Sequence, residues 1–248
     1  MWWQLSWRAP GIKNDTSIVV FTPSVYRFAE AYEIWAPINM IYNPERGPLS
    51  ITAEVPNNQT IPMMIARETY GEELRRVEFV VDFKQMLVLS APNSGVCMHA
   101  FDGQRSEISS FEEAASRLVY PFSNVGLIDT TQSPHQPPAG IFGEEPDHNW
   151  CFYYQNASLA RQDGNWDEIV KLGEEVRKLG LQPKDLSEWM PFYEGFAKGS
   201  RIDLANEAGA IIRNDQTFMW QFCDQYKNVD WSKEDKMDTY FVTNICGI

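Results

Sequence analysis

The strongest constraint in this sequence is a change in the spacing of its apolar residues on either side of a proline-rich stretch. Before residue 130, short runs rich in β-branched residues alternate with helix-like segments, whereas from Trp150 onward apolar residues recur about every 3.6 positions. Residues 129–149 hold four prolines and two glycines, a composition typical of an extended connection. We therefore predict a mixed α/β domain over 1–130, a proline-rich connector over 131–149 and a helical domain over 150–248.

The first half predicts a mixed sheet flanked by helices. Buried or alternating apolar runs indicate strands, whereas apolar residues on one side of a segment, with capping residues before them, indicate helices. Because only short turns separate the last three expected strands, we predict that these three pair as antiparallel neighbours. Strands are expected over 16–23, 49–55, 76–83, 85–91 and 95–101, and helices over 26–43, 61–73 and 109–122.

The second half repeats one plan of paired helices. Residues 150–183 predict two helices joined by a short Asp-Gly-Asn turn, and residues 185–215 predict an aromatic first helix, a glycine turn and an alanine-rich second helix. Superimposing Trp166 on Ile202 gives a repeat of about 36 residues, a period typical of helical arrays. Residues 217–229 are then expected to form a closing helix over the open end.

This half resembles the tetratricopeptide repeats. Residues 164–166, Gly-Asn-Trp, stand where that family has a Gly-Asp-Tyr turn, and Trp189 and Ala205 stand at its aromatic and small helix positions. Ile169 and Gly173 depart from the pattern, because the family has a small residue at the first position and an aromatic at the second. The resemblance implies a groove that binds peptides or proteins without catalysis. The predicted fold class is thus α/β plus α, a mixed β-sheet flanked by helices followed by a short tetratricopeptide-like α-helical array.

Four aromatic residues of the helical half are candidates for lining such a groove. Two small helix pairs offer little interior for so much aromatic surface, so we expect at least one of the four to face a protein or peptide partner. The alternative is that all four pack in the core. The candidates are Tyr153, Tyr154, Tyr193 and Phe196.

The tryptophan-rich start carries a second resemblance. Residues 7–10, Trp-Arg-Ala-Pro, are similar to the junction after the last transmembrane helix in bacterial polytopic membrane proteins related to lipid-linked-sugar glycosyltransferases of the dolichyl-phosphate-mannose type. The resemblance implies an extracytoplasmic accessory domain joined to the membrane through an upstream segment outside this chain, with Trp2, Trp3 and Trp7 at the membrane interface. The alternatives are that these tryptophans pack back on the sheet and that the protein is cytoplasmic.

Charge and motif content exclude several classes of function. The formal net charge is −13 and the longest basic run is Leu-Arg-Arg at 74–76, which argues against binding to nucleic acid. The sequence has no apolar run of about 18 residues, the length that a transmembrane helix needs. It also lacks the glycine motifs that bind phosphates or dinucleotides and the zinc-protease and serine-hydrolase motifs, so no cofactor is expected.

The titratable residues do not form a recognisable catalytic pattern. His99 falls in an expected strand and suits a half-buried structural role, while His135 and His148 flank an acidic connector that suits a solvated loop better than a metal site. Glu30 and Glu33 are interpreted as helix-surface carboxylates rather than an acid/base pair. We therefore expect a non-catalytic extracytoplasmic binding or scaffolding domain. The alternative is a glycan-processing enzyme domain with a carboxylate-based site between the sheet and the connector.

The four cysteines are scattered without the close spacing of a zinc site. Four buried thiols are the favoured interpretation. In an oxidising compartment one or two disulfides would form instead, and Cys223 with Cys246 is the first pair to consider because both lie in the closing segment.

Overall fold

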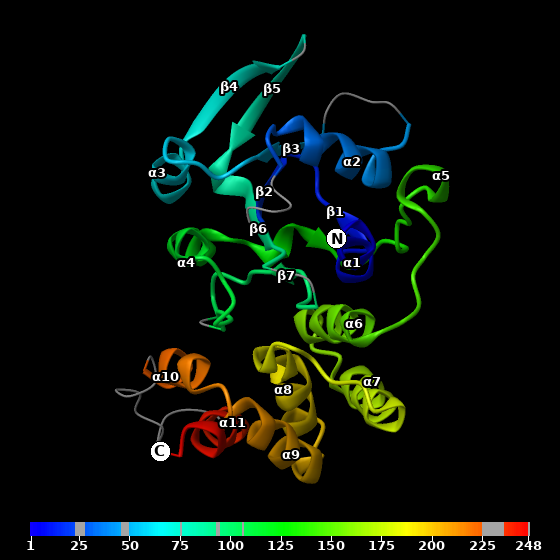
Figure 1. The fold of residues 1–248 in the computed structure, drawn as a ribbon, viewed down its shortest axis with the longest axis vertical. Coiled ribbons are helices and arrows are strands. Elements are labelled where there is room, and N and C mark those ends of the chain that lie inside the picture. Colours follow the sequence, from blue (N-terminus) through cyan, green and yellow to red (C-terminus); the bar gives the residue numbers. More distant parts are fainter. Residues whose placement is uncertain are drawn as a thin grey trace. The chain divides into compact units, whose positions relative to one another are not determined.

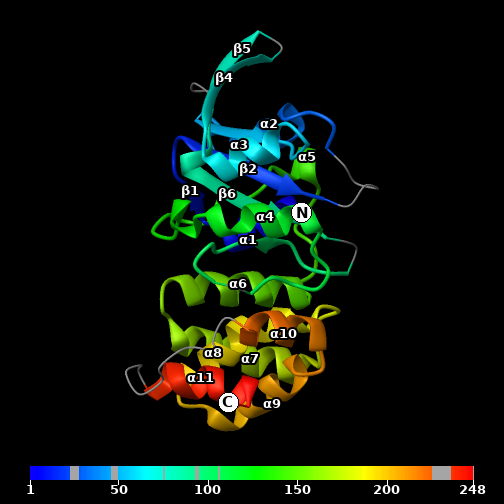
Figure 2. The same cartoon turned by 90° about the vertical axis from the view of Figure 1, so that its left-hand side faces the viewer.

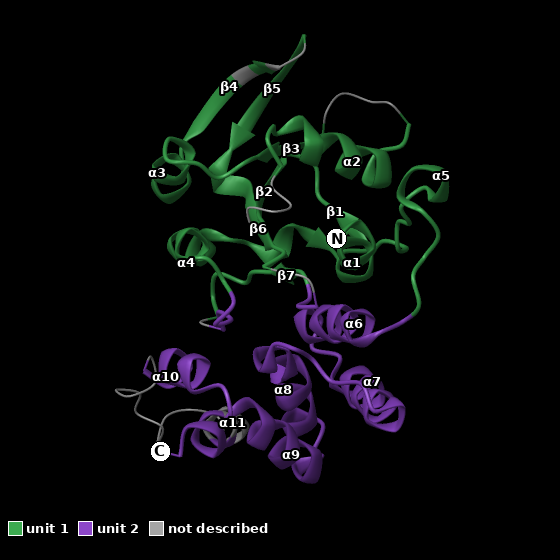
Figure 3. Ribbon diagram, in the orientation of Figure 1, with its two compact units in different colours: residues 1–94, 98–105, 112–147 green, residues 95–97, 106–111, 148–248 purple. Residues whose placement is uncertain are grey.

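The computed structural model describes residues 1–22, 28–45, 50–74, 76–92, 95–105, 107–224 and 236–247. Its contacts divide the chain into two compact units (Figure 3). Two short segments, 95–97 and 106–111, belong to unit 2 although the chain before and after each of them belongs to unit 1. Most of the expected connector falls in unit 1, which runs on to Asp147, and unit 2 resumes at His148. Unit 1 comprises Met1–Ser94, Met98–Arg105 and Glu112–Asp147, and unit 2 comprises Gly95–Cys97, Ser106–Phe111 and His148–Ile248.

Unit 1 is built around a mixed four-stranded sheet with the strand order β3-β2-β6-β7 (Figure 1). Strand β2 (Thr16–Phe21) lies parallel to both β3 (Ile51–Glu54) and β6 (Met86–Ser90), and β6 pairs with β7 (His99–Ala100) in the antiparallel sense. The mixed α/β character of the first half is therefore confirmed. A second small ladder joins the strands β1 (Gly11–Ile12) and β8 (Ile128–Asp129).

The expected antiparallel pairing of 76–83 with 85–91 is wrong. Strand β5 (Val77–Asp82) pairs instead with β4 (Thr69–Leu74) in a separate hairpin that extends beyond the sheet (Figure 2). All five residues of β6 are buried, as suits a central strand covered on both faces, whereas β5 alternates between buried and exposed positions. The second part of the helix expected over 61–73 is strand β4, because α3 (Thr60–Ala66) ends at Arg67 in a left-handed conformation.

Helices pack on the sheet of unit 1 through single apolar stripes. Helix α2 (Tyr32–Tyr42) buries Ile34, Ile38 and Ile41 and continues through Pro37. It begins later than expected, and residues 26 and 27 of the predicted helix lie outside the described residues. The carboxylate of Glu33 accepts hydrogen bonds from the N–H groups of residues 29 and 30, so it closes the start of this helix. Besides α2 and α3, the described part of the unit contains the α-helices α1 (Trp2–Arg8), α4 (Ala114–Val119) and α5 (Ala139–Phe142).

Unit 2 is helical and contains the two expected helix pairs. The side chain of Asn165 accepts from the N–H of Glu168 to cap α7, and Gly180 ends the same helix with a φ of 67°. The closing helix expected over 217–229 is seen as far as Asp224, and residues 225–229 lie outside the described ranges. The helices are α6 (Trp150–Gln162), α7 (Trp166–Leu179), α8 (Met190–Lys198), α9 (Ile202–Ile212), α10 (Gln216–Asp224) and α11 (Lys236–Cys246).

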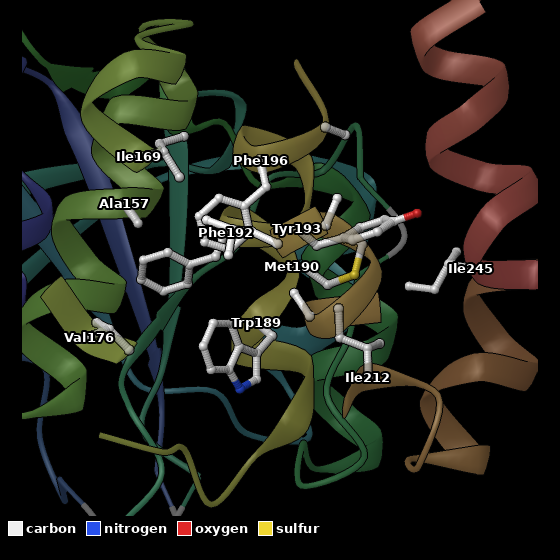
Figure 4. Packing of buried hydrophobic residues seen from close by; sticks show 14 of the residues in the cluster. Ala157, Ile169, Val176, Trp189, Met190, Phe192, Tyr193, Phe196, Ile212 and Ile245 are labelled. Atoms are coloured by element: carbon white, nitrogen blue, oxygen red, sulfur yellow. The ribbon is translucent and has the colours of Figure 1, made fainter. Parts of the chain in front are cut away.

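Helices α7 and α8 interlock through two glycines, each facing a large side chain of the other helix. These side chains, Ile169 and Phe196, are labelled in Figure 4. A Cβ on Gly173 would lie 2.3 Å from the ring of Phe196, and a Cβ on Gly195 would lie 2.3 Å from a methyl group of Ile169. Ile169 and Gly173 are the two departures from the tetratricopeptide pattern. Each is matched on α8 by a residue of complementary size, so the helices still approach closely.

Candidate functional site

Side chains of α6 and of the loops between the helices of unit 2 hold a segment without helix or strand, residues 107–111. Arg161 on α6 donates from both terminal guanidinium nitrogens to the carboxylate of Glu107, at 2.5 and 2.6 Å, and from Nε to Glu194 at 2.5 Å. Burial alone would lower the pKa of Arg161, but the two carboxylates raise it above its ordinary value. The guanidinium therefore remains a permanent cation that fixes Glu107 by a bidentate contact.

The next residues of the segment are held one after another. The hydroxyl of Ser109 donates to Asp185, which precedes the 3₁₀ turn Leu186–Trp189, and the hydroxyl of Ser110 donates to Asp215 at 2.9 Å. Lys184 lies over the ring of Phe111, 5.8 Å from its centroid. Unit 2 thus presents a cation on α6 and, from the loops between its helices, two acceptors and a second cation to a Glu-Ile-Ser-Ser-Phe sequence. We name the four side chains that do so, Arg161, Lys184, Asp185 and Asp215, the segment cradle.

A second segment, 95–97, is held in unit 2 by a disulfide and a buried carboxylate. Cys97 is bonded to Cys151 of α6. The N–H of Cys97 donates to Glu188 at 2.7 Å, and the indole of Trp150 donates to the other carboxylate oxygen at 2.6 Å. Both oxygens of Glu188 are therefore occupied by donors, as a buried charge requires.

Unit 1 carries a buried polar cluster at the carboxyl end of strand β6. Glu112 accepts from the hydroxyl of Ser90 at 2.5 Å with one oxygen and contacts Nδ1 of His99 at 2.6 Å with the other. This edge is where open α/β sheets bind ligands. Because the carboxylate stands between the hydroxyl and the imidazole, the arrangement ties β6, β7 and the segment before α4 together and does not place a base on a serine nucleophile.

Three of the four aromatic residues expected to line a groove are buried in unit 2. Tyr153, Tyr193 and Phe196 are at most 5% exposed, and Tyr154 is half-buried. Their helices turn these rings toward the shared core of unit 2, since such large apolar surfaces gain most from burial there. These three therefore pack in the core, and the expectation that at least one of the four faces a partner now depends on Tyr154, which is partly exposed.

The residues of the cradle were missed in the sequence. Arg161 and Asp185 look like ordinary surface charges there, because the partner of Arg161 lies 54 positions and that of Asp185 lies 76 positions earlier in the chain. The sequence offers one signal: Arg161 directly follows Ala160, and a small residue in an amphipathic helix suits the close approach of another helix.

The three tryptophans of the N-terminal helix lie half-buried on unit 1. Trp2 packs against Phe28 and Phe142, with ring centroids 6.0 and 6.2 Å away. The indole of Trp7 donates to Glu145 at 2.8 Å. This packing agrees with the alternative in which the tryptophans fold back on the domain, while their place at a membrane interface stays a prediction. In the described ranges, no helix has both the length and the apolar character needed to span a bilayer.

All four cysteines are paired, so the favoured interpretation as buried thiols is wrong. The pairing of Cys223 with Cys246 is confirmed, and the other two cysteines form the second bond. Their distance of 54 positions along the chain hides that second pairing in the sequence.

No family model, curated protein or solved structure matches this chain.

Proposed function

We propose that the chain is a non-catalytic, extracytoplasmic binding or scaffolding domain of a larger membrane protein, and that unit 2 acts in it as a short tetratricopeptide-like array. The observation that carries the proposal is the hold of the segment cradle on residues 107–111. Charged, hydroxyl and aromatic side chains of this one segment each meet a chemically matched side chain elsewhere in unit 2. Such residue-by-residue matching is how a peptide-binding surface selects a sequence.

The buried carboxylates support a structural role over catalysis. Glu112, Asp185 and Glu188 each accept hydrogen bonds from neighbouring donors. A general acid or base instead needs a carboxyl group within reach of a substrate proton. Because the hydrogen bonds of these carboxylates hold loops in place, they support a role as a scaffold.

The extracytoplasmic location is supported by the disulfides. Two bonds that use every cysteine are typical of proteins from oxidising compartments and rare in the cytosol. The link to a membrane through an upstream segment rests on the tryptophan-rich resemblance alone.

Peptide binding tests the cradle directly. We would replace residues 107–111 by glycine and serine and titrate the protein with a synthetic peptide of residues 105–113 by calorimetry. We expect saturable binding that is weakened at least tenfold by Arg161→Ala in the protein or by Glu107→Lys in the peptide. A folded protein that binds the native and the Glu107→Lys peptides equally, or neither of them, would contradict the proposal.

The compartment is tested separately. We expect no free thiol when the protein is taken from its native cells under alkylating conditions, denatured and examined by mass spectrometry. Four alkylated thiols would place it in a reducing compartment.

A further inference from the structure

The last described helix, α11, covers the outer side of the α8 and α9 pair. Val242 and Ile245 are its buried aliphatic side chains among the described ones, and both belong to the core cluster of unit 2. Figure 4 shows Ile245 on this helix beside Tyr193, whose hydroxyl points toward it. Part of the helical core is thus closed by a single helix.

Polar contacts complete this cover. The amide of Asn244 donates to the hydroxyl of Tyr193 at 3.2 Å, and Arg213 donates to the carbonyl of Asn244 at 3.0 Å. The hydroxyl of Tyr240 donates to Asn206 at 3.1 Å. Among the described side chains, the contacts of α11 with the α8 and α9 pair thus include two buried aliphatic residues and these three hydrogen bonds.

A covalent bond strengthens this interface. Cys246, the last residue of α11, is bonded to Cys223 on α10, and both cysteines are only half-buried. Cys97 of the other disulfide is fully buried, and a carboxylate oxygen of Glu188 lies 3.1 Å from its sulfur. A thiolate approaching Cys97 would meet this carboxylate in a buried site, whereas Cys223 and Cys246 are each partly exposed.

We propose that α11 is a redox-released strap: reduction of the Cys223–Cys246 bond frees it and uncovers the face of α8 and α9 around Tyr193. A dithiol reductant, small or protein-borne, attacks one sulfur and forms a mixed disulfide, and its second thiol then displaces the remaining cysteine. The sulfur–sulfur bond gains two electrons and two protons to give two thiols, and the dithiol is oxidised to a disulfide. The inference does not depend on what the segment cradle binds.

Graded reduction of the whole chain tests the first step. We would treat the protein with dithiothreitol over a range of concentrations, alkylate it and map the modified cysteines by mass spectrometry. Cys223 and Cys246 are expected to react at a dithiol concentration at least tenfold below that needed for Cys97 and Cys151. Equal susceptibility of the two bonds would overturn the proposal.

Hydrogen exchange tests the release. In the double variant Cys223→Ser/Cys246→Ser, the amides of 240–247 are expected to exchange at least tenfold faster while those of α6 and α7 keep their protection. The matched control Cys97→Ser/Cys151→Ser should leave 240–247 protected. If the variant does not fold, the partly reduced natural chain gives the same measurement. Unchanged protection of 240–247, or loss of protection throughout unit 2, would each overturn the strap.

Discussion

The ring of Phe196 fills the space beside Gly173, so that a Cβ at position 173 would lie 2.3 Å from the ring. Phe196 is buried and its helix is packed on α7, so the ring has little room to withdraw. We expect Gly173→Ala to lower the free energy of unfolding by about 1–3 kcal/mol, despite the better helix propensity of alanine. Urea denaturation of the two proteins measures the difference.

Gly140→Ala is the matched control, because a Cβ added at this position of α5 would meet no other atom within 4 Å. A combined Gly173→Ala/Phe196→Leu variant should recover part of the lost stability. If Gly173→Ala proves as stable as the natural chain, the close approach of α7 and α8 is not as described.

Removing the buried cation of Arg161 should lower the free energy of unfolding more than removing a surface charge. Arg161→Ala leaves Glu107 and Glu194 without their shared partner, a loss of about 3–5 kcal/mol. The raised pKa keeps Arg161 charged. Its contribution to the free energy of unfolding would be lost only as pH rises through that raised pKa. Deprotonation of Arg161 therefore adds no pH dependence to the stability below about pH 12.

The control for this change is Arg177→Ala, whose ion pair with Glu207 is exposed and should contribute at most about 1 kcal/mol. Thermal unfolding by calorimetry compares the two variants. Equal losses would show that the cradle does not hold Glu107 as a buried pair.

The helical unit should not fold from its own contiguous sequence. A fragment of residues 148–248 lacks Cys97, Glu107 and Ser109, so Cys151, Arg161 and Asp185 lose their partners. We expect it to unfold without a cooperative transition by circular dichroism, whereas the whole chain unfolds cooperatively. A fragment with a sharp transition at the same temperature as the whole chain would contradict this.

The buried cluster in unit 1 gives a local prediction. Glu112→Ala removes the acceptor of Ser90 and the partner of His99, and we expect a loss of about 2–3 kcal/mol on urea denaturation. Glu113→Ala is the neighbouring control, because that carboxylate is exposed and its side chain makes no capping hydrogen bond. The control should change stability by less than about 0.5 kcal/mol.

Asp129 should titrate below its ordinary range. Hydrogen bonds from the hydroxyl of Thr131, then from Gln132 and the N–H of Thr131, lower the pKa of this carboxyl below 3.8. Its contribution to stability is present above pH 3.8 and disappears as pH falls through the lowered value. An NMR titration of the side-chain carboxyl measures this pKa, and Thr131→Val should move it upward. An unchanged pKa in that variant would refute the assignment of the main cause.

Local patterns predicted the helix pairs well, because the apolar periodicity of 150–215 and the turn at Gly164 each depend only on residues that are close together in the sequence. They failed where the same residues suit both a helix and a strand. Residues 69–73 continue a helical pattern, but the helix ends at Arg67 and these residues form strand β4. Pairing between distant residues was beyond such patterns. No periodic pattern in the sequence indicates the bond of Cys97 to Cys151 or the contact of Glu107 with Arg161. The segment cradle could therefore be identified only from the structure.

Because segments 95–97 and 106–111 belong to unit 2, they are synthesised well before the helices that hold them. Cys97 and Glu107 are each made 54 residues before their partners. At ordinary rates of translation this interval lasts roughly 3–11 s. By the time Glu107 is made, all four strands of the sheet in unit 1 have been synthesised. The thiol of Cys97 and the carboxylate of Glu107 cannot meet their partners until α6 is synthesised.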